Sequence, residues 1–293
     1  MSLTCRAAFV PRSFSIHQGV PQAVSADGTR EDLHKLRPYF SALITYGQGN
    51  GQAVIPGLAV EIGFRALILG IWDPTDRSEL DTAIALARRY PDQVVGLVLG
   101  NEGLFWKRYS ASDISAATEY VRARLPQLAL GSSEPFALYL DSPEAGALLA
   151  LDMLLPNLHP RFESWFDPAS LDQAVDFVAE VLEKLHARTG KPILVKETGL
   201  PSGPEEQGFT EQRQSDFWVR LTERIKPGPL QNIAAFEAFD APWKPRELED
   251  EFGRLEPSEA HWGMFRQDGS PKPVVQRLGR RPAPTPAAAG ESR

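Results

Sequence analysis

The chain has 293 residues, of which 42% are apolar and 24% charged, and its formal net charge is -7. This length can build one large core, and a single α/β barrel needs about 250 residues. The acidic balance provides no basic surface, and the sequence has no Lys/Arg cluster interleaved with aromatics, which argues against nucleic acid as a partner.

Cysteine and histidine usage argues against disulfide and metal frameworks. Cys5 is the single cysteine, and the five histidines lack the close spacing of metal ligands on a helix. Residues 1–11 have no apolar core of a signal peptide, and no stretch approaches the roughly 18 apolar residues of a membrane helix. We expect no metal site, no signal peptide and no membrane segment, with a periplasmic or extracellular location if a precursor was trimmed and a cytoplasmic one otherwise.

Apolar runs of strand length alternate with amphipathic helical stretches almost from end to end. Helices are expected at 79–90 and 171–189, where apolar residues recur at three- and four-residue steps. The eight expected strands span residues 7–10, 42–46, 66–72, 94–102, 128–133, 152–159, 193–197 and 233–240. Eight strands with helical crossovers predict an α/β fold, a closed (β/α)8 TIM barrel.

The domain organisation follows from this pattern. Residues 1–279 are expected to form a single catalytic domain, in which 12–30 form a long loop, and the Pro/Ala-rich segment 280–293 is expected to be a disordered tail. The glycine-rich stretch 47–51 lacks the third small residue of a dinucleotide fingerprint, since Gln52 and Val54 stand there. We expect a flexible loop at the barrel mouth instead.

Two glutamates, Glu102 and Glu197, each follow an apolar run that is typical of a buried strand. The C-terminal ends of barrel strands are where barrel enzymes place their catalytic groups. A retaining glycosidase needs one protonated carboxyl and one ionised carboxylate about 5 to 5.5 Å apart. The amide of Asn101 can hydrogen-bond a sugar 2-hydroxyl, so the pattern predicts glycoside hydrolysis.

Four segments carry a resemblance to a known family. Residues 95–102, 196–203, 236–244 and 259–265 look like the signature segments of glycoside hydrolase family 17, in the family's order, and the likeness extends over residues 30–266. The resemblance implies a retaining β-1,3-glucanase or β-1,3-glucan glucanosyltransferase on a (β/α)8 barrel, working without a cofactor.

The same resemblance implies roles for individual residues. Glu102 would be the acid/base and Glu197 the nucleophile, with Asn101 and Tyr46 beside the nucleophile. The residues that it places around the sugar-binding end are Glu237, Asp240, Trp243, Lys244 and Glu259.

The chain departs from the family pattern at three positions. Ile44 stands where members often carry an Arg that would help to hold the nucleophile ionised. Leu200 replaces the usual Trp, and Ala241 replaces an acid or amide. We expect these changes to affect rate and substrate preference more than fold.

Several strand-end side chains have both a structural and a functional interpretation. Trp72 and Trp243 are expected at the barrel mouth as apolar faces for sugar rings. His159 is either a structural histidine or a residue that positions sugar or carboxylate, and Glu134 is either a subsite residue or a solvated loop acid. Trp106 and Trp165 are candidates for the cleft.

The substrate expected from these features is a β-glucan polysaccharide or oligosaccharide, and we expect a monomer. A β-1,3-glucan hydrolase and a transglycosylase share the same dyad, and the motifs do not separate them. A β-1,4-glycan hydrolase and a catalytically weak or silent glucan-binding barrel are the remaining alternatives.

Overall fold

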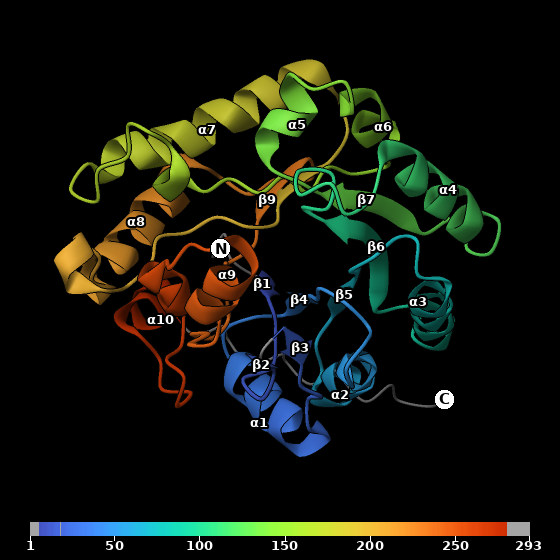
Figure 1. Ribbon diagram of the computed structural model, residues 1–293, viewed down its shortest axis with the longest axis horizontal. Coiled ribbons are helices and arrows are strands. Elements are labelled where there is room, and N and C mark those ends of the chain that lie inside the picture. Colours follow the sequence, from blue (N-terminus) through green and yellow to red (C-terminus); the bar gives the residue numbers. More distant parts are fainter. Residues whose placement is uncertain (1–5, 18, 280–293) are drawn as a thin grey trace, which may run out of the picture.

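The computed structural model describes residues 6–17 and 19–279, except for the side chains at 251 and 252, and the predicted tail 280–293 lies outside them. Parallel strands occupy the middle of the molecule and helices form an outer ring around them (Figure 1). The strands are β1 Arg6–Ala8, β2 Ile16–His17, β3 Val20–Pro21, β4 Ala42–Ile44, β5 Ala66–Ile71, β6 Val94–Asn101, β7 Ala129–Ser133, β8 Ile193–Val195 and β9 Gln231–Ile233.

The α-helices follow the strands along the chain, as the repeated βα pattern predicts. They are α1 Ala26–Leu36, α2 Ile55–Ile62, α3 Arg77–Arg89, α4 Ala111–Arg122, α5 Phe136–Leu140, α6 Ala145–Ala150, α7 Leu171–Arg188, α8 Glu211–Arg224, α9 Lys244–Phe252 and α10 Pro273–Leu278. Within the described residues, four short 3-10 helices lie in loops: η1 Gln52–Val54, η2 Pro160–Phe162, η3 Glu205–Gln207 and η4 Pro257–His261.

Backbone pairing closes the sheet into a barrel. One parallel sheet has the order β1-β4-β5-β6-β7, and a second pairs β8 with β9. Segment 152–158 fills the gap between them, because the Asp152 N–H donates to the carbonyl of Leu130 and the Leu154 N–H donates to that of Pro192, both at 2.9 Å. On the other side Ala7 pairs in parallel with Ala235. The predicted (β/α)8 barrel is therefore confirmed.

Three local predictions were wrong. Segment 152–159 pairs through isolated bridges at Leu154 and Asn157 instead of forming a continuous strand, because Pro156 has no N–H to donate. The last strand is at 231–233 instead of 233–240. Residues 12–30 are no plain loop: they contain the β2–β3 hairpin and the start of α1, which Ser25 caps by accepting a hydrogen bond from the Gly28 N–H.

The barrel interior is built in layers by the two-residue alternation of the strands. One layer is apolar and consists of Ile44, Ile68, Val98, Leu155, Leu194 and Ala234, with Met153 packed against it. Two residues further along their segments, Tyr46, Asn157, Lys196 and Phe236 follow Ile44, Leu155, Leu194 and Ala234. The apolar layer therefore forms the floor of a polar chamber at the C-terminal end of the barrel.

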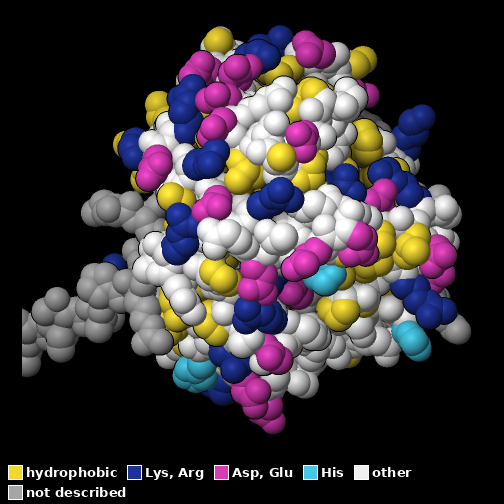
Figure 2. Space-filling model, turned by 90° about the vertical axis from the view of Figure 1, so that its left-hand side faces the viewer, with side chains coloured by type: hydrophobic (Ala, Val, Ile, Leu, Met, Phe, Trp, Pro, Cys, Tyr) yellow, Lys and Arg dark blue, Asp and Glu magenta, His cyan; other side chains and the backbone are white. Residues whose placement is uncertain are grey.

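The outer helices bury one face each and expose the other. In α7 the buried residues include Val175, Val178, Leu182 and Leu185, at the spacing that predicted this helix. Ion pairs such as Arg220–Asp172 join neighbouring helices at the surface. Basic and acidic side chains are interspersed over the face shown in Figure 2, without a large patch of either sign.

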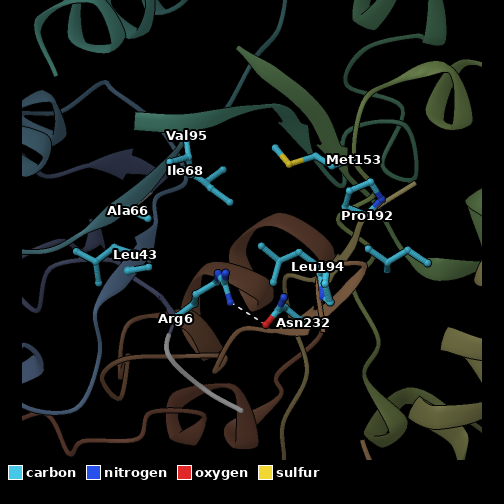
Figure 3. Close-up of a pocket in the computed structure, with 12 residues that line it drawn as sticks. Arg6, Leu43, Ala66, Ile68, Val95, Met153, Pro192, Leu194 and Asn232 are labelled. Atoms are coloured by element: carbon cyan, nitrogen blue, oxygen red, sulfur yellow. Dashed lines mark hydrogen bonds between the residues drawn. The ribbon is translucent and has the colours of Figure 1, made fainter. Parts of the chain in front are cut away.

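A cavity of about 170 Å³ lies at the opposite end of the barrel from the two glutamates. It is lined by residues at strand starts, including Arg6, Ala42 and Ala66, and Arg6 donates a 2.9 Å hydrogen bond to Asn232 at its edge (Figure 3). Because catalytic groups of barrel enzymes lie at the C-terminal ends of the strands, we do not assign the active site to this cavity.

Candidate active site

Glu102 follows the end of β6 in a backbone conformation that is unusual for a non-glycine residue, with φ of 53°. The β6–β7 register shifts between Val98 and Asn101, and Gly100 adopts φ of 86° in this stretch. A Cβ on Gly100 would lie 2.0 Å from the Tyr109 hydroxyl, and one on Gly103 would lie 1.9 Å from the Tyr109 ring. Both glycines are therefore required so that Tyr109 can pack beneath the loop that follows Glu102.

Glu134 anchors the same loop from the end of β7. Its carboxylate accepts hydrogen bonds from the backbone N–H of Leu104 at 3.1 Å, the N–H of Phe105 at 3.3 Å and the hydroxyl of Tyr109 at 2.9 Å. The side chain is fully buried, so the interpretation of Glu134 as a solvated loop acid was wrong. Burial raises the pKa of Glu134 to about 7 despite these hydrogen bonds.

Asn157 holds the carboxyl of Glu102. Its side-chain amide donates to Oε1 of Glu102 at 2.9 Å, and its own Oδ1 accepts from the Ser133 hydroxyl at 3.0 Å. Burial, followed by the negative charge of Glu197, raises the pKa of Glu102, while the Asn157 hydrogen bond acts in the opposite direction. The surroundings of Glu102 therefore shift its equilibrium toward the protonated form.

Glu197, 5% exposed, follows β8 and lies between two basic side chains. Lys196 Nζ is 2.7 Å from Oε1, and His159 Nε2 is 3.4 Å from Oε2. Burial acts to raise the pKa of Glu197, but the charge of Lys196 and the hydrogen bond from His159 outweigh it and hold the pKa well below its usual range. Glu197 is therefore the ionised member of the pair.

The sequence did not predict a role for Lys196 in the active site. Its side chain is 1% exposed, and Nζ also donates to Oδ1 of Asn101 at 2.6 Å and lies 3.8 Å from the ring centre of Tyr46. Asn157 was missed in the same way. The available signal was strand alternation, since Lys196 and Asn157 each stand two residues after an inward-facing leucine.

His159 follows segment 152–158 and contacts the dyad, as its strand-end position suggested. Its ring packs edge-on against Phe236 and Trp262, with centres 5.1 Å apart in both cases. Its Nδ1 is buried without a hydrogen-bond partner among the described residues. The Tyr46 hydroxyl is also buried, and burial and the nearby charge of Glu197 raise the pKa of Tyr46.

Glu237 and Lys244 form a second charged group beside the dyad. Lys244 Nζ donates to Oε1 of the buried Glu237 at 2.6 Å and lies 4.7 Å from the ring centre of Phe236. The charges of Glu237 and Glu259 raise the pKa of Lys244 against the effect of burial, so Lys244 stays charged. Oε1 of Glu259 is buried without a partner in the described part of the chain.

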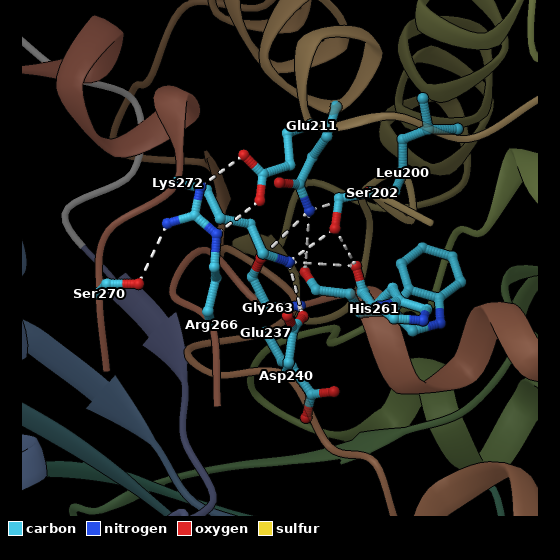
Figure 4. Close-up of polar contacts among 12 residues, drawn as sticks. Leu200, Ser202, Glu211, Glu237, Asp240, His261, Gly263, Arg266, Ser270 and Lys272 are labelled. Carbon is cyan, nitrogen blue, oxygen red and sulfur yellow. Dashed lines mark hydrogen bonds and ion pairs between the residues drawn. The ribbon is translucent and has the colours of Figure 1, made fainter. Parts of the chain in front are cut away.

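Asp240 belongs to a network that joins three segments of the chain. Oδ1 accepts from Lys272 Nζ at 2.6 Å and from the Gly263 N–H at 3.0 Å, and Lys272 also donates to the Ser202 hydroxyl at 2.7 Å (Figure 4). Lys272 is 1% exposed. These contacts fasten the loops after β8 and β9 to the segment before α10.

The tryptophans occupy several environments. Trp72 is 47% exposed, and the Arg108 guanidinium stacks 4.2 Å from its ring centre. Trp243 is half-buried edge-on against Phe14. Trp106, 45% exposed, forms an edge-to-face pair with Phe105 in the loop after Glu102. Trp165 packs against Phe166 and Phe177, in the outer hydrophobic cluster.

The 47–51 loop is tied to its neighbours. The backbone N–H of Gln48 donates to Glu79 at 2.8 Å, and its side-chain amide donates to the carbonyl of Gly70 at 2.8 Å.

In residues 6–17 and 19–279 there is no group of three or more His, Cys, Asp or Glu side chains that could hold a metal ion. None of the helices in these ranges is long and apolar enough to cross a membrane.

The barrel and two buried glutamates whose pKa values are shifted in opposite directions define the class of protein. The chain is a glycoside hydrolase or a transglycosylase of the same type. Residues 13–263 match the BtgE/BtgC glycoside hydrolase domain, and the chain belongs to that family. The predicted relationship to glycoside hydrolase family 17 is confirmed by this match together with the similar proteins below.

Curated proteins similar to the chain include fungal enzymes. A glucan 1,3-beta-glucosidase of Arthroderma benhamiae is 25% identical over 264 residues, covering 83% of this chain and 82% of that protein. A glucan 1,3-beta-glucosidase of Saccharomyces cerevisiae is 22% identical over 260 residues, covering 80% of each.

Solved structures share the fold at lower identity. The glycoside hydrolase family 17 beta-1,3-glucanosyltransferase of Rhizomucor miehei has a TM-score of 0.69 at 18% identity, covering 93% of this chain and 96% of that one. An endo-laminarinase from Formosa Hel1_33_131 has a TM-score of 0.73 at 19% identity, covering 94% and 86%.

Proposed function

We propose that the protein cleaves β-1,3-linked glucan with retention of anomeric configuration, through a covalent glycosyl-enzyme. Glu197 attacks the anomeric carbon while Glu102 protonates the departing oxygen. Glu102 then removes a proton from the incoming acceptor, whose oxygen bonds to the anomeric carbon as the bond to Glu197 breaks. The observation that carries this proposal is a pair of buried glutamates at strand ends, one held by the amide of Asn157 and the other between Lys196 and His159.

The surroundings of the dyad support a sugar ligand. Several buried polar atoms have no partner among the described residues, and Nδ1 of His159 and Oε1 of Glu259 are two of them. A buried polar group without a partner is costly unless a ligand or water satisfies it. Because a pyranose carries several hydroxyls that both donate and accept, it can satisfy groups of both kinds.

The linkage preference is supported by the similar proteins. The curated relatives are named glucan 1,3-beta-glucosidases, and a Rhizomucor miehei beta-1,3-glucanosyltransferase mutant was solved in complex with laminaritriose. We extend β-1,3-glucan to this chain on that basis. A panel of laminarin, cellulose, xylan and mannan tests the choice, since preferential cleavage of a β-1,4-linked polymer would contradict it.

Transglycosylation is the second candidate activity, and one observation favours it. Phe105 and Trp106 are 50% and 45% exposed in the loop directly after Glu102, with ring centres 4.9 Å apart. Exposed aromatics next to the acid/base can stack on an acceptor sugar and help it to compete with water.

Product analysis on laminari-oligosaccharides distinguishes the two activities. Products longer than the substrate indicate transfer, and only shorter products indicate hydrolysis. The first reducing sugar released should be the β-anomer, because two displacements restore the starting configuration, and an α-anomer would contradict double displacement. Binding without any product would support the silent glucan-binding alternative.

We also propose that residues 6–279 form one domain that acts as a monomer. The closed barrel supports this organisation, since its elements share one large buried cluster that runs from Ala7 to Val275. Size-exclusion chromatography with light scattering tests it, with a mass near 32.3 kDa expected.

A further inference from the structure

Lys196 supplies a positive charge directly beside Glu197. Ile44 is fully buried in the apolar floor of the chamber, so this position of β4 contributes no charged side chain. Lys196 extends from the end of β8 into the layer above and reaches Oε1 of Glu197 at 2.7 Å. The floor therefore stays apolar while the nucleophile still has a cationic partner.

The contacts of Lys196 connect three segments of the barrel. Its ammonium group donates to Asn101 at the end of β6, contacts Glu197 after β8, and lies over the ring of Tyr46 after β4. Because Oδ1 of Asn101 is held by this contact, the amide N–H groups are the ones left to face a substrate. A 1% exposed lysine would be strongly unfavourable without such partners.

We propose that Lys196 is a positioning residue that keeps Glu197 ionised and orients the amide of Asn101 toward the substrate. This inference rests on the proposed function and adds to it a residue that neither the motifs nor the similar proteins assign. Lys196 contacts the carboxylate of Glu197 and the side chain of Asn101, and it acts on the substrate through these two residues.

Other titratable groups also face Glu197 and must be kept in the comparison. They are His159 at the end of segment 152–158, Tyr46 after β4, Glu102 after β6, Glu237 after β9 and Lys244 in α9. Each of them is unchanged in a Lys196 variant, so a difference between variants reports Lys196 alone.

Three substitutions separate charge from hydrogen bonding. Lys196→Arg keeps the charge, Lys196→Gln keeps a hydrogen-bond donor without charge, and Lys196→Met keeps neither. The pH profile of kcat/KM on a laminari-oligosaccharide is measured for each. Removing an opposite charge at this distance raises a carboxyl pKa by about one to three units, so the acid limb should move up by that amount in Gln and Met.

The arginine variant should keep the acid limb near that of the unchanged protein, even if its bulk lowers kcat. The matched control is Lys191→Met, since Lys191 donates to the carbonyls of Leu149 and Leu151 at 2.7 Å and sits outside the active site, just before β8. This control should lower the melting temperature without moving the limb.

The inference is overturned if folded Lys196→Gln or Lys196→Met protein keeps the acid limb of the unchanged protein. Circular dichroism identifies a variant that does not fold, and the glutamine variant, which keeps polar contacts in the chamber, then decides. Failure of the proposed function is a separate result, because the unchanged protein would then release no product from any laminari-oligosaccharide.

Discussion

Asn157 donates a 2.9 Å hydrogen bond to Oε1 of Glu102, and its backbone forms a parallel bridge with that of Glu197. A single residue in an irregular segment therefore fixes one carboxyl through its side chain and the other through its main chain. The relative position of the two carboxyls thus depends on the segment that completes the barrel between β7 and β8.

Replacing Asn157 by Leu should move the basic limb of the pH profile upward. The amide hydrogen bond favours the ionised form of Glu102 and lowers its pKa, so its loss should raise the pKa further. The basic limb reports deprotonation of the acid, and it should shift to higher pH by the same amount in kcat/KM.

Ser133→Ala is the matched control for Asn157. It removes the hydrogen bond to Oδ1 of Asn157 but leaves the amide donor to Glu102 in place. We expect the basic limb to stay where it is. An equal shift in both variants would mean that general loosening of the segment, and not the hydrogen bond, sets the pKa of Glu102.

Glu134→Gln should flatten the dependence of stability on pH. The pKa of Glu134 is raised from 4.5 to about 7 in the folded protein, so the folded state binds more protons than the unfolded state between these values. Its contribution to stability is therefore fully present below pH 4.5 and is lost as the pH rises through about 7, by at most roughly 3 kcal/mol.

Urea denaturation at several pH values between 4 and 8 measures this effect. The free energy of unfolding should fall less steeply with pH in Glu134→Gln than in the unchanged protein. Glu119→Gln, at an exposed position on α4, serves as the control and should leave the slope as it is. Parallel curves for all three proteins would contradict the assignment of a raised pKa to Glu134.

Gly103→Ala should disrupt the loop after Glu102 and reduce activity more than ten-fold. The new methyl group would lie 1.9 Å from the ring of Tyr109, so either the ring or the loop must move. Gly146→Ala in α6 is the control, because nothing lies within 4 Å of that position and alanine favours a helix.

A second substitution tests the cause of this loss. If the clash with Tyr109 is responsible, adding Tyr109→Ala to Gly103→Ala should cost much less than the sum of the two single changes. Strictly additive effects on activity and melting temperature would show that the two residues do not compete for the same space.

The barrel could be predicted from the sequence because apolar residues recur at the spacing of strands and helices. The two glutamates could be predicted from their place directly after such strands. Each glutamate follows an apolar strand, and such a strand places its last residue at one end of the barrel whatever its neighbours are. The sixth segment was harder to predict, since Pro156 interrupts its pairing and only isolated bridges remain.

The supporting residues could not be predicted with the same methods, because their roles depend on contacts between distant segments. Lys196 contacts Asn101, 95 positions earlier in the chain, and Asn157 contacts Glu102, 55 positions earlier. Glu134 also stands at the end of a strand, as Glu102 does, but its carboxylate lies beneath a loop and accepts a hydrogen bond from Tyr109. Only the folded geometry distinguishes these acids.

The central claim is that Glu197 is the nucleophile and Glu102 the acid/base. In Glu197→Ala, hydrolysis should fall by several orders of magnitude while the circular dichroism spectrum is unchanged. In Glu102→Ala the glycosyl-enzyme can still form from a substrate with a good leaving group, and azide should then attack it to give a β-glycosyl azide.

The most direct measurement is azide rescue of Glu197→Ala with an activated β-laminaribioside, followed by NMR of the product. We predict that azide restores turnover and that the product is the α-glycosyl azide, because the small anion occupies the space of the missing carboxylate and inverts the anomeric carbon in one step. A β-glycosyl azide, or full activity of Glu197→Ala without azide, would contradict the account.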